Sequence, residues 1–94
     1  MRLSKWSSAF RRDFKRESKG PNRYVLKEEL YAVISALSKD IPLPVQYQDH
    51  KLTGEWEGCR ACHLKPDLVL IYEKPDGETL RLARMGSHSE LYGL

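Results

Sequence analysis

The three histidines of this chain all lie in its second half, near positions where a strand or helix is expected to end. They are His50, His63 and His88, and Asp67 and Arg84 occupy comparable positions. Histidine can accept and donate a proton near neutral pH, and arginine can hold a phosphate group. These side chains are what an enzyme needs to cleave a phosphodiester without a metal ion. The sequence therefore predicts an active site, provided that folding brings these positions together.

Each of these residues also has an ordinary structural explanation. A histidine in a small protein is often a surface residue or a hydrogen-bonded structural one. Asp67 follows Pro66 and is also suited to a turn, and Arg84 is also suited to a cross-strand ion pair. Only the joint pattern favours catalysis over these alternatives.

Length and composition indicate one small domain spanning residues 1–94. A hydrophobic content of 40% with 31% charged residues is ordinary for a globular protein. No stretch approaches the roughly 18 apolar residues needed to cross a bilayer, and no apolar segment follows the first residues as in a signal peptide. We therefore expect a cytoplasmic protein without a membrane partner.

Positive charge is concentrated near the N-terminus. Residues 1–27 hold nine Lys and Arg against two acidic residues, a net charge of +7, so the remainder of the +3 chain carries −4. Such a basic segment fits an anionic partner, either a nucleic acid or an acidic protein. A solvated helix face explains it equally well.

The two cysteines form a C-x-x-C pattern at Cys59 and Cys62. This spacing occurs in redox pairs and in half of a zinc site. Here it lies in a run that reads as a strand, where residues three apart point to opposite faces. There is no further cysteine to complete a zinc site. We therefore expect free, buried or half-buried thiols, and neither a metal nor another cofactor.

The first half of the chain predicts two helices. Residues 7–18 carry Phe10 and Phe14 on one face behind a possible cap at Ser7 or Ser8, and Gly20-Pro21 ends this helix. Residues 24–39 form the second helix, whose apolar residues recur at helical spacing. The short break between the two predicts an antiparallel helical hairpin.

The second half predicts strands. Residues 41–50 contain two prolines and read as an irregular connection. Strand-like runs follow at residues 56–63, 68–72 and 80–85, joined by short turns at 65–67 and 75–77. A further short strand at about residues 2–5 can pair with them. The predicted class is α+β: a helical hairpin packed on one face of a small twisted antiparallel sheet of three to four strands.

A family resemblance rests on residues 42–92, in a consistent order and spacing. The matching segments include Tyr47-Gln48-Asp49-His50-Lys51-Leu52-Thr53-Gly54-Glu55-Trp56, Arg60, His63, Pro66-Asp67, Arg84 and Gly86-Ser87-His88-Ser89-Glu90-Leu91-Tyr92. In these the chain resembles the YafQ-type toxins of the RelE/ParE superfamily. The N-terminal half is similar only in being a helical hairpin. The two cysteines stand outside the family pattern, and Tyr92 replaces a phenylalanine.

The resemblance implies a toxin of a type II toxin–antitoxin pair. Such toxins are endoribonucleases that cut mRNA, typically in the ribosomal A site, and an acidic antitoxin of the DinJ/RelB kind silences them. The family's catalytic positions correspond to His50, His63, Asp67 and His88 in this sequence. Arg84 matches a basic position at the end of the last strand, and Tyr92 matches the C-terminal aromatic residue.

The chemistry leaves the roles of these residues open. His50 and His88 are candidates for the acid and the base in either order, and His63 or Asp67 is an alternative base. Arg84, with Arg60 as a second candidate, would hold the phosphate.

Tyr92 and Trp56 would stack on an unpaired base of the RNA substrate. Trp56 also suits the edge of the core, and Tyr92 also suits a C-terminal anchor. Two other functions compete with the nuclease: a non-catalytic ParE-like toxin that binds DNA gyrase, and a basic domain that only binds nucleic acid or an antitoxin. The presence of all three histidines argues against the ParE-like reading.

Overall fold

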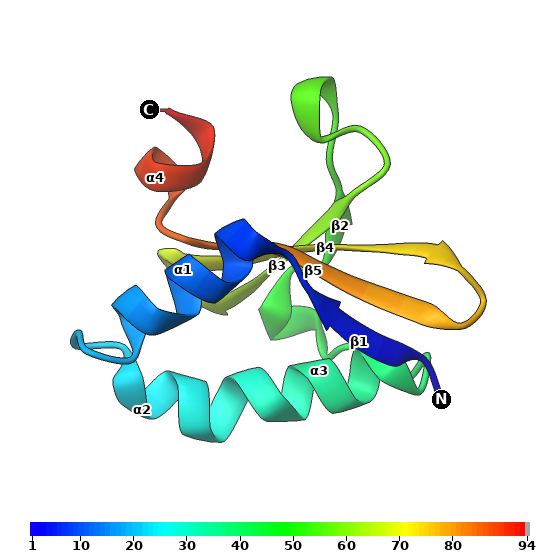
Figure 1. The fold of residues 1–94 in the computed structure, drawn as a ribbon, viewed down its shortest axis with the longest axis horizontal. Coiled ribbons are helices and arrows are strands. Elements are labelled where there is room, and N and C mark those ends of the chain that lie inside the picture. Colours follow the sequence, from blue (N-terminus) through cyan, green and yellow to red (C-terminus); the bar gives the residue numbers. More distant parts are fainter. Residues whose placement is uncertain (94) are drawn as a thin grey trace.

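The computed structural model describes residues 1–93 and has helices on a five-stranded sheet (Figure 1). The predicted α+β class is confirmed. The strands are β1 (Leu3–Trp6), β2 (His50–Lys51), β3 (Arg60–Lys65), β4 (Leu68–Asp76) and β5 (Thr79–Gly86). The helices are α1 (Ser8–Glu17), α2 (Arg23–Val25), α3 (Tyr31–Ser38) and α4 (His88–Tyr92), with a π-helical turn η1 (Leu26–Leu30) and 3-10 turns η2 (Val45–Tyr47) and η3 (Gly54–Trp56).

The strand order in the sheet is β1-β5-β4-β3-β2. Strands β3, β4 and β5 form the predicted antiparallel meander. Two features differ from the prediction: β2 adds a short fifth strand, and β1 runs parallel to β5, with Leu3 opposite Thr79 and Trp6 opposite Leu82. Because β1 and β5 are distant in sequence, no turn dictates an antiparallel pairing.

Helix α1 begins where the sequence predicts. The Ser7 hydroxyl accepts a hydrogen bond from the backbone N–H of Phe10 at 2.9 Å, which caps the first turn. The Phe10 side chain is fully buried and meets Trp6 edge to face, with ring centroids 4.9 Å apart. The apolar face of α1 is thereby directed onto the sheet.

The second predicted helix is continuous but not uniform. Segments α2, η1 and α3 follow one another from residue 23 to residue 38, against the predicted 24–39. Leu26, Leu30, Val33 and Leu37 are all buried, as their spacing predicts. The π-helical turn was not predicted, because one additional residue per turn leaves little trace in the apolar spacing. Such turns occur frequently at functional sites.

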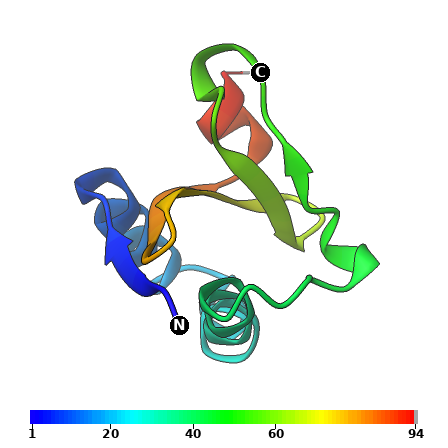
Figure 2. The same ribbon diagram turned by 90° about the vertical axis from the view of Figure 1, so that its right-hand side faces the viewer.

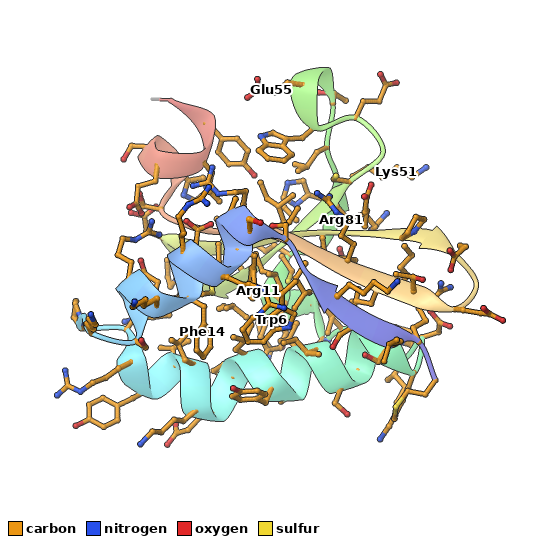
Figure 3. The ribbon with its side chains drawn as sticks, viewed as in Figure 1. Trp6, Arg11, Phe14, Lys51, Glu55 and Arg81 are labelled. Atoms are coloured by element: carbon orange, nitrogen blue, oxygen red, sulfur yellow. The ribbon has the colours of Figure 1, made fainter. Side chains whose placement is uncertain are left out.

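Both helices pack on the same face of the sheet and run in opposite directions, as a hairpin does (Figures 1 and 2). We call the resulting cluster the helix-side core. Figure 3 shows Trp6 and Phe14, which pack against it, between α1 and the continuous helix formed by α2, η1 and α3. Each fully buried leucine in such a cluster contributes about 1.5–3 kcal/mol. The main members are Phe10, Leu26, Leu30, Val33 and Leu37 from the helices with Leu70, Tyr72, Leu80, Leu82 and Met85 from the sheet.

The opposite face carries a second, smaller cluster, which we call the α4-side core. Its strand residues are Ala61, Val69, Ile71 and Ala83, and Leu91 of α4 covers them. The loop of residues 52–59 rises beside α4 and adds Leu52, Cys59 and Trp56. Figure 3 shows Glu55 at the tip of this loop and Lys51 on its side away from α4. Helix α4 was not predicted, and it forms much of the wall above this face.

Beyond the end of β1, side chains of α1 and its cap take the place of a neighbouring strand. The Ser7 hydroxyl donates to the carbonyl of Ala83 at 2.7 Å, and Arg16 donates to the carbonyl of Met85 at 3.0 Å. The carboxylate of Asp13 accepts from the backbone N–H of Met85 at 2.9 Å. The polar groups of this β5 edge are therefore satisfied without a strand partner.

Two strand boundaries differ from the prediction. Trp56 lies in η3 instead of starting a strand, because Gly54 and Gly58 adopt left-handed conformations (φ 71° and 93°) that interrupt extended backbone. Strand β4 extends to Asp76, whose side chain accepts from the backbone N–H of Glu78 and forms the predicted turn.

Within residues 1–93 no helix is long and apolar enough to cross a membrane.

The two cysteines are free and buried, and they belong to different cores. Cys62 lies in the helix-side core and Cys59 in the α4-side core. This confirms that the sulfurs diverge across the sheet. Burial raises the pKa of the Cys62 thiol to about 12, so this thiol is unreactive at neutral pH.

Candidate active site

The three histidines lie together on the face of the sheet that carries α4. His50 comes from β2, His63 from β3, and His88 is the first residue of α4. The ring centroids of His50 and His63 are 6.1 Å apart, and those of His63 and His88 are 5.3 Å apart. His63 is thus the middle member of a row of three imidazoles whose outer members, His50 and His88, are 38 positions apart in the sequence.

Asp67 joins this row through His88. Its carboxylate oxygen Oδ1 lies 2.7 Å from Nδ1 of His88 and accepts from the backbone N–H of the same residue at 3.0 Å. Both bonds lower the pKa of the Asp67 carboxyl, and the bond from the backbone N–H contributes more. An ionised carboxylate can only accept, so Nδ1 carries the hydrogen. Nε2 of His88 is therefore the nitrogen left for a substrate.

Helix α4 holds His88 at a defined place. The Ser87 hydroxyl accepts from the backbone N–H of Glu90 at 3.2 Å, and the Glu90 carboxylate accepts from the backbone N–H of Ser87 at 2.9 Å. This reciprocal pair is a capping box, which fixes the first helical turn. Tyr92 lies one turn further on, with its ring centroid 5.9 Å from that of His88.

His50 is oriented by its own loop. Its Nδ1 lies 2.7 Å from the carbonyl oxygen of Gln48, which can only accept, so Nδ1 is again the protonated nitrogen. The adjacent Asp49 accepts from the Tyr72 hydroxyl at 2.7 Å and from Nε of Arg60 at 3.1 Å. Arg60 is therefore held in an ion pair with Asp49 and lies opposite Tyr72 in the strand register, whereas His50 lies opposite Ala61.

The environment of His63 favours its neutral form. Burial lowers the pKa of this imidazole, and the neighbouring charges of His88 and His50 lower it further, against an opposing hydrogen bond to the backbone of Pro66. An imidazole that is neutral at neutral pH can accept a proton.

Arg84 does not contact the imidazole row. Its Nε and Nη2 donate to the two carboxylate oxygens of Asp13 at 2.7 Å and 3.2 Å. This bond raises the pKa of the Arg84 guanidinium. The ion pair links β5 to α1, and it is not the cross-strand pair that the sequence also allowed. Three N–H groups of the guanidinium remain for another ligand.

The two aromatic candidates both pack against the α4-side core. Trp56 is half-buried there, and its indole Nε1 is buried without a hydrogen-bond partner in the described part of the chain. Tyr92 is also half-buried, and burial raises the pKa of its hydroxyl. The core-edge explanation of Trp56 thus matches its packing, and Tyr92 is the aromatic ring beside the histidines.

The side chains of the described residues do not form a metal-binding cluster. No group of three or more His, Cys, Asp and Glu side chains within residues 1–93 is arranged to hold a metal ion. The absence of a metal from the reaction stays a prediction.

Sequence reasoning missed two features that shape this site. Helix α4 carries the signal Ser87-x-x-Glu90, which is a capping-box pattern and could have predicted a helix start. Asp13 and Glu17 are acidic residues on the apolar face of a basic helix, three and seven positions after Phe10. That placement indicates buried partners, but nothing in the spacing names Arg84 as one of them.

Comparison with known proteins agrees with this architecture. The family model described as "Bacterial toxin of type II toxin-antitoxin system, YafQ" matches residues 2–93. The chain belongs to the YafQ toxin family. It is 41% identical over 63 residues to the mRNA interferase toxin YafQ of Escherichia coli K12, an alignment that spans 67% of each chain.

Solved YafQ structures share the whole fold. The crystal structure of YafQ from E. coli BL21(DE3) superposes with a TM-score of 0.85 at 33% identity, covering 99% of this chain and 100% of that one. A crystal structure of the E. coli DinJ–YafQ complex gives a TM-score of 0.81 at 34% identity, with the same coverage. That YafQ is therefore known in complex with DinJ.

Proposed function

We propose that this YafQ-family toxin is a metal-independent endoribonuclease that cleaves mRNA, in the ribosomal A site and hence in the cytoplasm. The observation that carries the proposal is the row of three imidazoles with a carboxylate on His88. The name of the E. coli relative, an mRNA interferase, supports the same activity.

The geometry supports different catalytic roles for the three histidines. Cleavage requires a base that takes the proton of the ribose 2′-hydroxyl and an acid that gives one to the departing 5′-oxygen. His63 suits the base, because its lowered pKa keeps it neutral. His88 suits the acid, because the Asp67 carboxylate holds its ring through Nδ1 and directs Nε2 toward the open side of the site. His50 lies next to His63 and is the second candidate for the base.

Other side chains would bind the substrate. Arg84, with three N–H groups free of Asp13, is proposed to meet the charge that develops on the phosphate, and Arg60, which is paired with Asp49, is proposed to meet the RNA backbone. Tyr92 is proposed to stack on an unpaired base next to His88, with Trp56 supporting that wall.

The partner in the resting state is proposed to be an acidic antitoxin of the DinJ type. The solved DinJ–YafQ complex supports this choice. On α1, Arg11, Arg12 and Lys15 are exposed, and they take part in none of the ion pairs within residues 1–93. An unpaired basic face of this kind favours an acidic protein or RNA.

The test is to replace His50, His63 and His88 singly with alanine and to measure message cleavage on translating ribosomes together with growth inhibition. His88→Ala, which lacks the proposed acid, should cleave the message about 10²- to 10⁴-fold more slowly. Tyr31→Ala, which removes an exposed aromatic ring from α3, is the control and should keep full activity.

Full growth inhibition by all three folded histidine variants would contradict the nuclease proposal. A toxin that bound gyrase would leave the message intact and change DNA topology instead.

A further inference from the structure

A hollow of about 350 Å³ borders the imidazole row at the outer edge of β3. His63 lines it together with Leu64, Lys65 and Pro66 at the end of β3, and the opposite wall is formed by Glu29 of η1 with Gln46, Tyr47 and Gln48. Its volume lies at the lower end of the range of small-ligand sites. Because His63 belongs to both the row and the hollow, a ligand here would lie directly beside the scissile bond.

Two irregular backbone segments meet at this hollow. Glu29 projects from the π-helical turn, and Gln48 is a non-glycine residue in the left-handed region, with φ 50° and ψ 42°. Conformations of this kind are costly and are retained mainly where function requires them. The carbonyl of Gln48 also accepts from Nδ1 of His50, so the hollow and the histidines are structurally coupled.

The Glu29 carboxylate is held in a fixed place. The Tyr47 hydroxyl donates to its Oε2, and Oε1 has no hydrogen-bond partner within residues 1–93. This bond is the main reason why the pKa of the Tyr47 hydroxyl is raised. The Tyr47 ring lines the same hollow and offers a surface on which a base can stack.

A carboxylate beside an RNA-cleaving site repels phosphates, so its attraction must be for donors on a base. Guanine, adenine and cytosine carry exocyclic amino groups, whereas uracil has none, and the one N–H on its Watson–Crick edge is flanked by carbonyl oxygens. The free Oε1 would accept from an amino group and repel the uracil carbonyls.

We propose that this hollow binds the nucleotide next to the scissile phosphodiester and that Glu29 selects a base with an exocyclic amino group over uracil. The inference rests on the proposed nuclease function. It adds which nucleotide of the RNA the hollow binds and which bases it accepts.

The decisive variant is Glu29→Gln, whose amide oxygen can still accept from Tyr47 while the negative charge is lost. Glu28→Gln is the matched control, since Glu28 is the exposed neighbour on the same turn and does not line the hollow. Cleavage is measured on ribosome-bound messages that differ only in the base on either side of the cut. At one of these positions we expect the wild type and Glu28→Gln to cleave a uracil message about tenfold more slowly than amino-bearing ones. In Glu29→Gln this difference should fall below about twofold.

A second measurement separates this inference from the nuclease proposal. Binding of 2′-O-methyl trinucleotides, which cannot be cleaved, is followed through the amide NMR signals of Gln46 and Gln48. Shifts that require an amino-bearing base and weaken in Glu29→Gln support the hollow even in a protein that cuts no RNA. Identical base profiles of wild type and folded Glu29→Gln, or no shifts with any trinucleotide, would overturn the inference while leaving the histidine test unaffected.

Discussion

At the scale of single residues, the central position of His63 decides how the site responds to pH. Its imidazole is half-buried between two other histidines, and both burial and their charges disfavour protonation. His50 and His88 are instead defined by what their Nδ1 atoms donate to, a carbonyl and a carboxylate. One residue type is thereby given three different environments.

We predict that His63 titrates below the ordinary histidine value of 6.5. Because the folded pKa is lowered, the stability that folding gains from neutral His63 is fully present above pH 6.5. This stability, and with it the proposed base, is lost as pH falls through the folded pKa. NMR titration of the His63 ring measures this. In His50→Asn one of the neighbouring charges is gone, so the midpoint should move upward. A wild-type midpoint at or above 6.5 would contradict the environment described for His63.

At the scale of elements, α1 contributes both its apolar face and its polar side chains to the fold. Its phenylalanines cover the sheet, and its polar side chains complete the free edge of β5. Asp13 is nearly inaccessible and accepts from Arg84, Arg16 and the backbone of Met85. The strand that leads to Gly86, Ser87 and His88 is therefore anchored by a helix more than 70 residues earlier in the chain.

We predict that Asp13→Ala destabilises the fold by about 3–5 kcal/mol, because the change leaves Arg84 and a buried N–H unpaired. Arg12→Ala, at the exposed neighbouring position, should change stability by less than about 0.5 kcal/mol. Urea unfolding curves of the two variants measure the difference. If Asp13→Ala were as stable as Arg12→Ala, the anchoring role of the carboxylate would be refuted.

At the scale of the whole molecule, the two faces of the sheet have different tasks. The helix-side core contains most of the large buried side chains and holds the strands in place. The α4-side core is small, and the histidines of the same face are exposed or half-buried. Among the basic residues of the first 27 positions, Arg2 and Arg16 form ion pairs with Asp40 and Asp13. The other basic side chains of this segment are exposed.

We predict that the association rate with an acidic antitoxin falls as salt rises, because screening weakens long-range attraction. Replacing Arg11, Arg12 and Lys15 together with alanine should lower this rate and flatten its salt dependence. Arg81→Ala is a suitable control, since Arg81 is already paired with Glu73. Stopped-flow measurements at several salt concentrations test this, and a rate that is independent of salt would count against electrostatic steering.

The sequence by itself determined the features that short-range patterns encode. Apolar spacing predicted both helices and their buried faces, turn residues predicted the meander, and alternation along a strand predicted that Cys59 and Cys62 diverge. Only the tertiary structure decided the parallel pairing of β1 with β5, the bonds of Asp13 to Arg84 and of Asp67 to His88, and the meeting of Glu29 with Tyr47. These contacts join residues 18 to 76 positions apart, and no local pattern records which distant group a side chain will meet once the chain closes.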